Sequence, residues 1–153
     1  IEISSIARSL DDDEMCRLIK NASSKGIKVI NEVGVAFAHS KVIEEEIFIE
    51  RIKMQSKRFL EAGSWKILLE SEGLTENLDK KNYRWNIIDK IISPLELNQF
   101  MVEADDQDVL SKYIDIYGPG INMMVDFSRV LKMEDARIGY GPSQSLWGKV
   151  VKY

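Results

Sequence analysis

The chain has one histidine, His39, and one cysteine, Cys16, among its 153 residues. Imidazole and thiolate groups carry much of the hydrolytic, redox and metal chemistry of proteins near neutral pH. With one copy of each, a zinc cluster of cysteines and histidines and an intrachain disulfide are both excluded. Structural roles are expected for both, Cys16 as a small core residue of a helix. We therefore predict no catalytic residue, no metal and no cofactor.

Long apolar runs and proline are also scarce. No apolar stretch approaches the roughly 20 residues that span a bilayer, so no membrane segment is expected. No segment that resembles a signal peptide follows Ile1. A single free cysteine suits a reducing compartment, which predicts an intracellular protein, cytoplasmic or nuclear. Three prolines in the whole chain fit a helical bundle better than a β-sandwich or barrel.

The composition is that of one globular domain, with 44% hydrophobic and 30% charged residues. Capping residues and apolar positions at helical spacing recur along the chain. We predict a mostly α, single-domain bundle of about six or seven helices with an irregular C-terminal tail. The expected helices are 10–24, 41–62, 64–72, 85–93, 93–104, 105–117 and 121–133.

The helix boundaries rest on local signals, among them Ser9 as the expected N-cap of helix 10–24 and Asp105 as that of helix 105–117. Residues 93–96, Ser-Pro-Leu-Glu, combine a capping serine, a proline at the first helical position and a glutamate that completes a capping box. Residues 118–120, Gly-Pro-Gly, end the helix before them. The apolar residues of 27–39 mix the alternating spacing of a strand with the 3.6-residue spacing of a helix. A helix is favoured there, and a short β-hairpin near 27–38 is the alternative.

The expected organisation is a helical domain over residues 1–136 and an extended basic tail over residues 137–153. The tail contains three bases and no acids, and it is rich in glycine and serine at its start. Its aromatic residues suit docking on a neighbouring chain; they are Tyr140, Trp147 and Tyr153.

Charge is segregated along the chain although the net charge is only −4. Residues 51–90 carry nine bases and six acids, whereas residues 91–136 carry nine acids and three bases. Such a distribution favours docking of acidic on basic surfaces, either between copies of the chain or with a partner.

One segment combines basic and aromatic residues in the pattern that suits single-stranded nucleic acid. Cationic side chains can follow the phosphates while aromatic rings stack on the bases. The candidate contacts are Lys57, Arg58, Lys80, Lys81, Tyr83, Arg84 and Trp85. The alternative is that the aromatic rings belong to the core and the cations form a solvated helix face.

Acidic clusters and glycine segments give no further site. Residues 11–14 and 105–108 lack the ligand spacing of a calcium loop and suit helix N-termini. Residues 44–46 suit a solvated helix face, because no Glu-x-x-His element accompanies them. The glycine segments match no phosphate-binding motif and are interpreted as turns.

These observations favour a non-enzymatic intracellular module that presents helical faces to a protein partner or to a second copy of itself. The alternative is a helical nucleic-acid-binding or nucleoprotein-assembly domain that prefers single-stranded RNA. An enzyme would need a mechanism based on carboxylates, and the sequence alone does not locate one.

Overall fold

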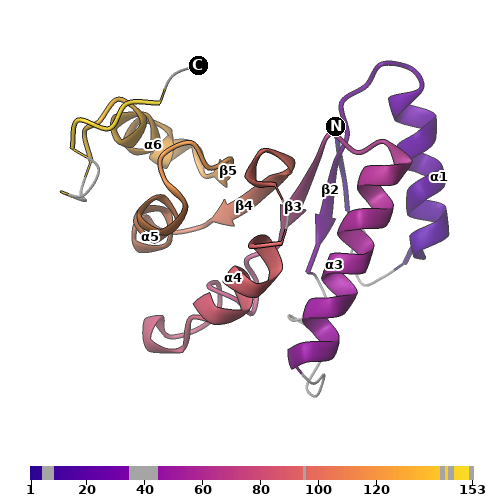
Figure 1. Ribbon diagram of the computed structural model, residues 1–153, viewed down its shortest axis with the longest axis horizontal. Coiled ribbons are helices and arrows are strands. Elements are labelled where there is room, and N and C mark those ends of the chain that lie inside the picture. The colour runs from indigo at the N-terminus through magenta and orange to yellow at the C-terminus, as the bar shows by residue number, and fades with distance from the viewer. Residues whose placement is uncertain (5–8, 35–44, 95, 142–143, 145–146, 152–153) are drawn as a thin grey trace. The chain divides into compact units, whose positions relative to one another are not determined.

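The computed structural model describes residues 1–4, 9–34, 45–94, 96–141, 144 and 147–151, and it shows an α/β protein in which parallel strands alternate with helices (Figure 1). The strands are β1 (Glu2–Ile3), β2 (Ile30–Val33), β3 (Lys66–Leu69), β4 (Phe100–Ala104) and β5 (Met123–Val125). The α-helices are α1 (Asp12–Ser23), α3 (Glu45–Ala62), α4 (Trp85–Ile92), α5 (Gln107–Tyr117) and α6 (Val130–Arg137). Short 3₁₀ helices are η2 (Lys80–Asn82), η3 (Leu97–Gln99) and η4 (Phe127–Arg129).

The chain forms two compact units, Ile1–Met101 and Val102–Tyr153. In the first unit β2 lies between β1 and β3 and is parallel to both. The register pairs Ile30 of β2 with Lys66 of β3. In the second unit the end of β4 runs parallel to β5. Parallel neighbours require a crossover, and helices supply it here, as in other α/β folds.

The core of the first unit lies between strands and helices. Ile67, Leu68 and Leu69 of β3 are each at most 1% exposed, so both faces of this strand are covered. Helix α3 packs against α1, α4, β2 and β3, and Figure 1 shows α1 and α3 side by side. The residues that α3 buries include Phe48, Ile52 and Phe59.

The core of the second unit is built by β4, β5 and α5. Val102 and Ala104 of β4 are buried, and α5 buries Val109, Leu110, Tyr113 and Ile114. Among the described residues, no helix is long and apolar enough to cross a membrane.

The predicted all-helical bundle is wrong, because three of its segments contain strands. Residues 64–72 contain β3, residues 93–104 contain η3 and β4, and residues 121–133 begin with β5. Strands that are buried on both faces carry continuous apolar runs instead of alternating ones. A short run of this kind cannot be distinguished from part of a buried helix by periodicity alone.

The segment 27–39, for which a helix was favoured, contains β2 in its described part. β2 pairs with β1 and β3 in parallel, so residues 27–34 are not half of a hairpin either. Residues 35–39 lie outside the described residues.

Four predicted helices are confirmed, namely 10–24, 41–62 in its described part, 85–93 and 105–117. An aspartate caps each of two of these helices, but in neither case is it the residue that was expected. The N-cap of α1 is Asp11, which accepts from the backbone N–H of Glu14 at 2.8 Å, whereas Ser9 was expected there. Asp106 caps α5 through Val109 in the same way, whereas Asp105 was expected there.

Candidate active site

Acidic residues lie at the carboxyl ends of the parallel strands in each unit. Glu32 is the next-to-last residue of β2, and Glu70 follows β3 directly. Glu103 is the next-to-last residue of β4, and Asp126 follows β5 directly. In folds that alternate parallel strands with helices, site residues come from this end of the strands. The carboxyl ends are therefore where a site is expected.

In the first unit, the ends of β2 and β3 meet at Glu70. The backbone N–H of Glu70 donates to the carbonyl of Val33 at 2.9 Å, which extends the pairing of the two strands. Gly34 follows in a left-handed conformation with φ of +104°. A Cβ atom at Gly34 would lie 3.4 Å from the Cβ of Glu70 and from Cδ1 of Leu69. The positive φ therefore explains the glycine, and a Cβ atom there would touch Glu70 at ordinary van der Waals distance.

The segment Glu70–Glu76 forms a turn, called the Glu70–Glu76 turn below. The carbonyl of Ser71 accepts from the backbone N–H groups of Leu74, Thr75 and Glu76 at 2.9, 2.9 and 3.0 Å. Ser71 and Thr75 are each 1% exposed. This turn is thus held by its own backbone and packed against the core.

The turn fixes two carboxylates close to each other. Oε1 of Glu70 accepts from the backbone N–H groups of Ser71 and Glu72 at 2.8 and 3.1 Å. The hydroxyl of Ser71 donates to Oε2 of Glu76 at 3.0 Å. Glu70 and Glu76 offer carboxylate oxygens within 4.8 Å of each other. Such a pair can move a proton to or from a substrate, and its oxygens also suit a hard divalent cation.

A cavity of about 520 Å³ lies beside the carboxyl end of β2. Glu32 and Gly34 line it, together with the start of α1 and one side of α3. Two arginines of α3, Arg51 and Arg58, also line the cavity. Arg58 donates to Asp13, and this hydrogen bond raises the pKa of its guanidinium. Arg51 therefore places a positive charge in the same cavity as Glu32.

In the second unit, Glu103 and Asp126 have different roles. Glu103 is half-buried on β4 and lies in register with Met124. Asp126 caps η4, and its Oδ1 accepts from the backbone N–H of Ser128 at 2.9 Å. Hydrogen bonding from Ser128 lowers the pKa of Asp126, helped by the charge of Arg129. Capping of η4 thus accounts for Asp126 at this position. Glu103 is the candidate site residue of this unit.

The residues predicted to contact nucleic acid lie in two places of the first unit. The list comprises Lys57 and Arg58 on α3, Lys80 and Lys81 in η2, and Tyr83, Arg84 and Trp85 at the start of α4. Both cations on α3 form ion pairs with acidic side chains. The rings of Tyr83 and Trp85 meet edge to face with their centroids 6.2 Å apart.

The aromatic residues of the tail are exposed where they are described. Tyr140 is 73% and Trp147 is 61% exposed, and Tyr153 lies outside the described residues. The indole N–H of Trp147 donates to the carbonyl of Gly141 at 3.0 Å. Docking of this tail on another chain stays a prediction.

Neither the one histidine nor the one cysteine is among the described residues that form the strand-end site. His39 lies outside the described residues. Cys16 is a free, half-buried cysteine of α1, and its sulfur lies 4.0 Å from the carbonyl oxygen of Arg58.

Sequence reasoning missed the glutamates of this site. Glu70 was placed inside an expected helix, and Glu32 and Glu76 were not singled out. A signal for Glu70 is nevertheless present, because the apolar run Ile67–Leu69 has the length of a strand and ends abruptly at an acid. A serine and a glycine follow within three residues, which is typical of a turn.

The chain is similar to a known family and to a plant protein. Residues 1–141 match the family described as ComA, (2R)-phospho-3-sulfolactate synthase. The chain is also 32% identical over 93 residues to Protein HEAT-STRESS-ASSOCIATED 32 of Arabidopsis thaliana. That alignment covers 59% of this chain and 32% of the relative, so the chain spans about a third of the relative's length.

The family match overturns the interpretation as a non-enzymatic module and, with it, the RNA-binding alternative. The expectation of no enzyme was drawn from the lack of histidine and cysteine. That argument fails because carboxylates at strand ends can carry acid–base chemistry without either residue. The match covers nearly the whole chain, and the parallel strands that alternate with helices and end in acids agree with it. The chain belongs to the ComA family of (2R)-phospho-3-sulfolactate synthases.

Proposed function

We propose that this chain forms the carbon–sulfur bond of a phosphorylated three-carbon sulfonate, with Glu70 and Glu76 as its acid–base residues. The observation that carries the proposal is the Glu70–Glu76 turn at the carboxyl end of β3. Two carboxylates are held there by backbone and hydroxyl donors, at the end of the strands where such folds place their chemistry.

The chemistry follows from the product in the family description. (2R)-Phospho-3-sulfolactate carries a carboxylate at C1, a phosphate on the C2 oxygen and a sulfonate on C3. Removing the C2 proton together with sulfite from C3 leaves an enol phosphate, phosphoenolpyruvate. In the synthetic direction, the sulfur lone pair of sulfite attacks C3, and the electrons of the C2–C3 double bond move to C2. One proton added at C2 completes the product, so the addition needs no oxidant or reductant.

The residues of the turn have distinct tasks in this step. Because the proton reaches C2 from one face only, a fixed proton donor produces a single configuration at that carbon. Glu76, which accepts from the Ser71 hydroxyl, supplies or relays that proton. Glu70, oriented by two backbone N–H groups, is the second acid–base group and exchanges this proton with Glu76. Arg51 balances part of the negative charge of the substrates.

The test is to incubate the purified chain with phosphoenolpyruvate and sulfite and to follow product by phosphorus NMR. We expect product from the wild-type chain and a rate at least about 100-fold lower in Glu70→Gln. Glu61→Gln is the matched control, because Glu61 is an exposed glutamate of α3. An inactive wild-type chain, or a Glu70→Gln variant at the wild-type rate, would overturn the proposal.

Carboxylate chemistry needs no cysteine, so the single free Cys16 sets no redox requirement. A protein with one thiol suits a reducing compartment, and we infer that the enzyme works inside the cell. Finding the labelled chain outside the cell would contradict this inference.

A further inference from the structure

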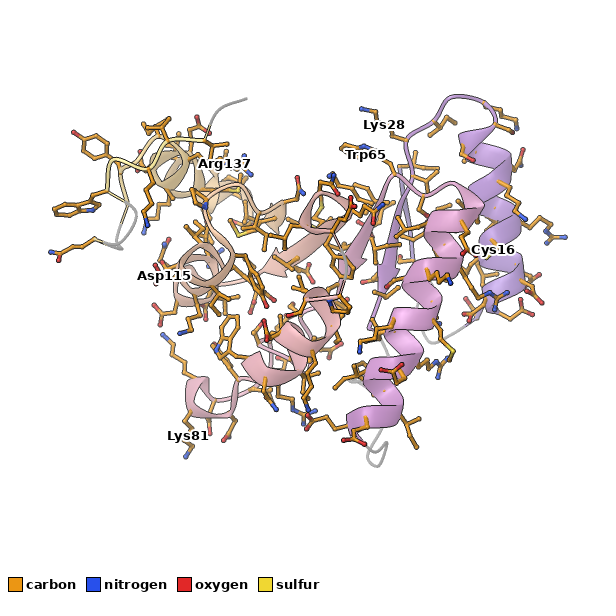
Figure 2. All side chains as sticks on the ribbon, viewed as in Figure 1. Cys16, Lys28, Trp65, Lys81, Asp115 and Arg137 are labelled. Carbon is orange, nitrogen blue, oxygen red and sulfur yellow. The ribbon has the colours of Figure 1, made fainter. Side chains whose placement is uncertain are left out.

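Two lysines and a tryptophan gather at the amino ends of β2 and β3, opposite the acidic ends of the same strands. Trp65 directly precedes β3, and its backbone N–H donates to the carbonyl of Val29 at 2.7 Å. This bond places Trp65 beside Lys28, and Figure 2 shows the two side chains next to each other. Together with Lys66 they form the Lys28–Trp65–Lys66 cluster.

Both ammonium groups of the cluster contact the same indole ring. Nζ of Lys28 lies 4.5 Å and Nζ of Lys66 lies 4.7 Å from the ring centroid. Trp65 is 45% exposed, whereas Lys66 is only 8% exposed. The cluster therefore combines a half-open aromatic surface with a buried positive charge.

The positive charge of the cluster is not neutralised by the described side chains. Among the residues that the structure describes, neither Lys28 nor Lys66 forms an ion pair. Nζ of Lys66 donates to the backbone carbonyl of Asn98, which occupies one of its three N–H groups. Burial lowers the pKa of Lys66, and the positive charge of Lys28 lowers it further. Two positive charges held against one ring repel each other, and a bound anion would reduce this repulsion.

We propose that the Lys28–Trp65–Lys66 cluster binds a doubly charged oxyanion of the size of sulfate or phosphate. A dianion matches the two ammonium groups in charge, and its oxygens accept from the N–H groups that Asn98 leaves available. The long lysine stems let both groups turn toward one tetrahedral anion at the open edge of the indole. This site is separate from the Glu70–Glu76 turn and does not depend on the proposed reaction.

The first experiment is a sulfate titration followed by the fluorescence of Trp65. The chain has three tryptophans, so Trp85→Phe/Trp147→Phe leaves Trp65 as the reporter. We expect a saturable change with sulfate and none with sodium chloride at equal ionic strength. Fluorescence is preferred to a melting temperature, because sulfate stabilises folded proteins without a specific site.

Lys28→Gln provides the decisive variant, because Lys28 is exposed and its loss should not disturb folding. We expect sulfate affinity to fall at least about threefold, the loss that removing one exposed charge partner causes. Lys25→Gln is the matched control, an exposed lysine with no aromatic contact among the described residues. Equal titrations in Lys28→Gln and the background chain would overturn the proposal, as would equal responses to sulfate and chloride.

A pH series tests the part of Lys66. Sulfate stays doubly charged across the alkaline range, so a loss of affinity with rising pH reports deprotonation of the protein. We expect affinity to fall as Lys66 loses its proton and to persist to higher pH in Lys66→Arg. A fall at the same pH in both chains would contradict a role for Lys66.

Two further sets of titrations identify the class of anion and show which end of the strands gives the signal. Inorganic phosphate and glycerol phosphate are titrated beside sulfate, and tighter binding of glycerol phosphate would assign the site to phosphate esters. Glu70→Gln should leave all three titrations unchanged, since it alters only the carboxyl end. A titration that changes in Glu70→Gln would show that the signal comes from the other end of the strands.

Discussion

The two ends of β2 and β3 carry opposite charge and different chemistry. The carboxyl ends bear Glu32 and the Glu70–Glu76 turn, together with Gly34, whose φ is positive. The amino ends bear the Lys28–Trp65–Lys66 cluster. Only the buried residues Ile67–Leu69 separate the two ends along β3. One strand pair thus presents an acidic edge and a basic edge a few residues apart.

Helix dipoles explain part of this difference. Each helix that follows a parallel strand begins near the strand's carboxyl end, where its positive pole favours acids. Its negative pole lies near the amino ends, where cations are favoured. Asp11, Asp106 and the glutamates that begin α3 are acids of this kind. A charged residue at a strand end is therefore weak evidence of function by itself. Acids that only complement a helix dipole must first be distinguished from acids that belong to a site.

Glu76→Gln should separate charge from hydrogen bonding at the acidic end. The amide oxygen of the new side chain still accepts from the Ser71 hydroxyl, so stability should change little. Synthase rate should fall about 100-fold or more, because the amide cannot transfer the proton.

The matched variant is Glu46→Gln, which removes an exposed acid from the first turn of α3. It should cost about 0.3–1 kcal/mol through the lost dipole interaction and leave the rate unchanged. Rates from phosphorus NMR and unfolding free energies from urea titration check both. Equal rates in the two variants would mean that Glu76 only complements a dipole.

Gly34→Ala should damage the acidic end through the backbone. Its φ of +104° is unfavourable for alanine, and the new Cβ would meet Glu70 and Leu69 at 3.4 Å. We expect a loss of about 1–2 kcal/mol in the unfolding free energy together with a slower synthase rate.

Gly26→Ala is the comparison for this prediction, since Gly26 also has positive φ but meets nothing within 4 Å. Its φ alone should cost about 1–2 kcal/mol of stability, and it should keep its rate. Urea unfolding and the rate assay on both variants decide the matter. If Gly26→Ala slows the reaction as much as Gly34→Ala, close approach to Glu70 is not the cause.

Ser71→Ala should weaken the Glu70–Glu76 turn more modestly. The variant removes the hydroxyl that donates to Glu76 from a residue that is 1% exposed. The expected loss is about 1 kcal/mol in unfolding free energy, the typical worth of a buried hydrogen bond. The hydroxyl of Ser24 is exposed and donates to the carbonyl of Asn21, so Ser24→Ala should lower the unfolding free energy far less. Similar losses in the two variants would argue against an organised turn.

The sequence allowed the helices to be predicted better than the strands. The starts of α1 and α5 were predicted to within two residues, because capping depends on neighbours in the sequence. The strand β3 gives no such local signal, because all four of its residues are buried and pairing partners come from distant segments. Ser93 to Glu96 formed a good capping box in sequence, and tertiary pairing of β4 prevailed over it.

The candidate site was hidden for the same reason. Glu32 and Glu70 lie far apart in sequence, and only the parallel pairing of β2 and β3 brings their strand ends together. The basic end was equally hidden, since Lys28, Trp65 and Lys66 acquire their common ring contact from that register. Once the strands are known, both sets follow from their positions at the strand ends.

The smallest expected effect concerns the pH dependence of stability at the basic end. The pKa of Lys66 is lowered in the folded chain, so with rising pH the folded state loses this proton before the unfolded state does. The unfolded state then binds more protons, and stability rises with pH until the unfolded lysine also titrates near 10.5. Below the lowered pKa the folded chain carries the full cost of the charge.

Lys66→Met removes both the charge and this pH dependence. The unfolding free energy of Lys66→Met minus that of the wild-type chain should be larger at neutral pH than at pH 10. For Lys25→Met the same difference should not change with pH. Urea titrations at a series of pH values in chloride, without sulfate or phosphate, measure the difference. Parallel curves for Lys66→Met and the wild type would mean that Lys66 is well solvated. The amino end would then differ from the carboxyl end in the sign of its charge alone, and a bound anion would relieve no electrostatic cost there.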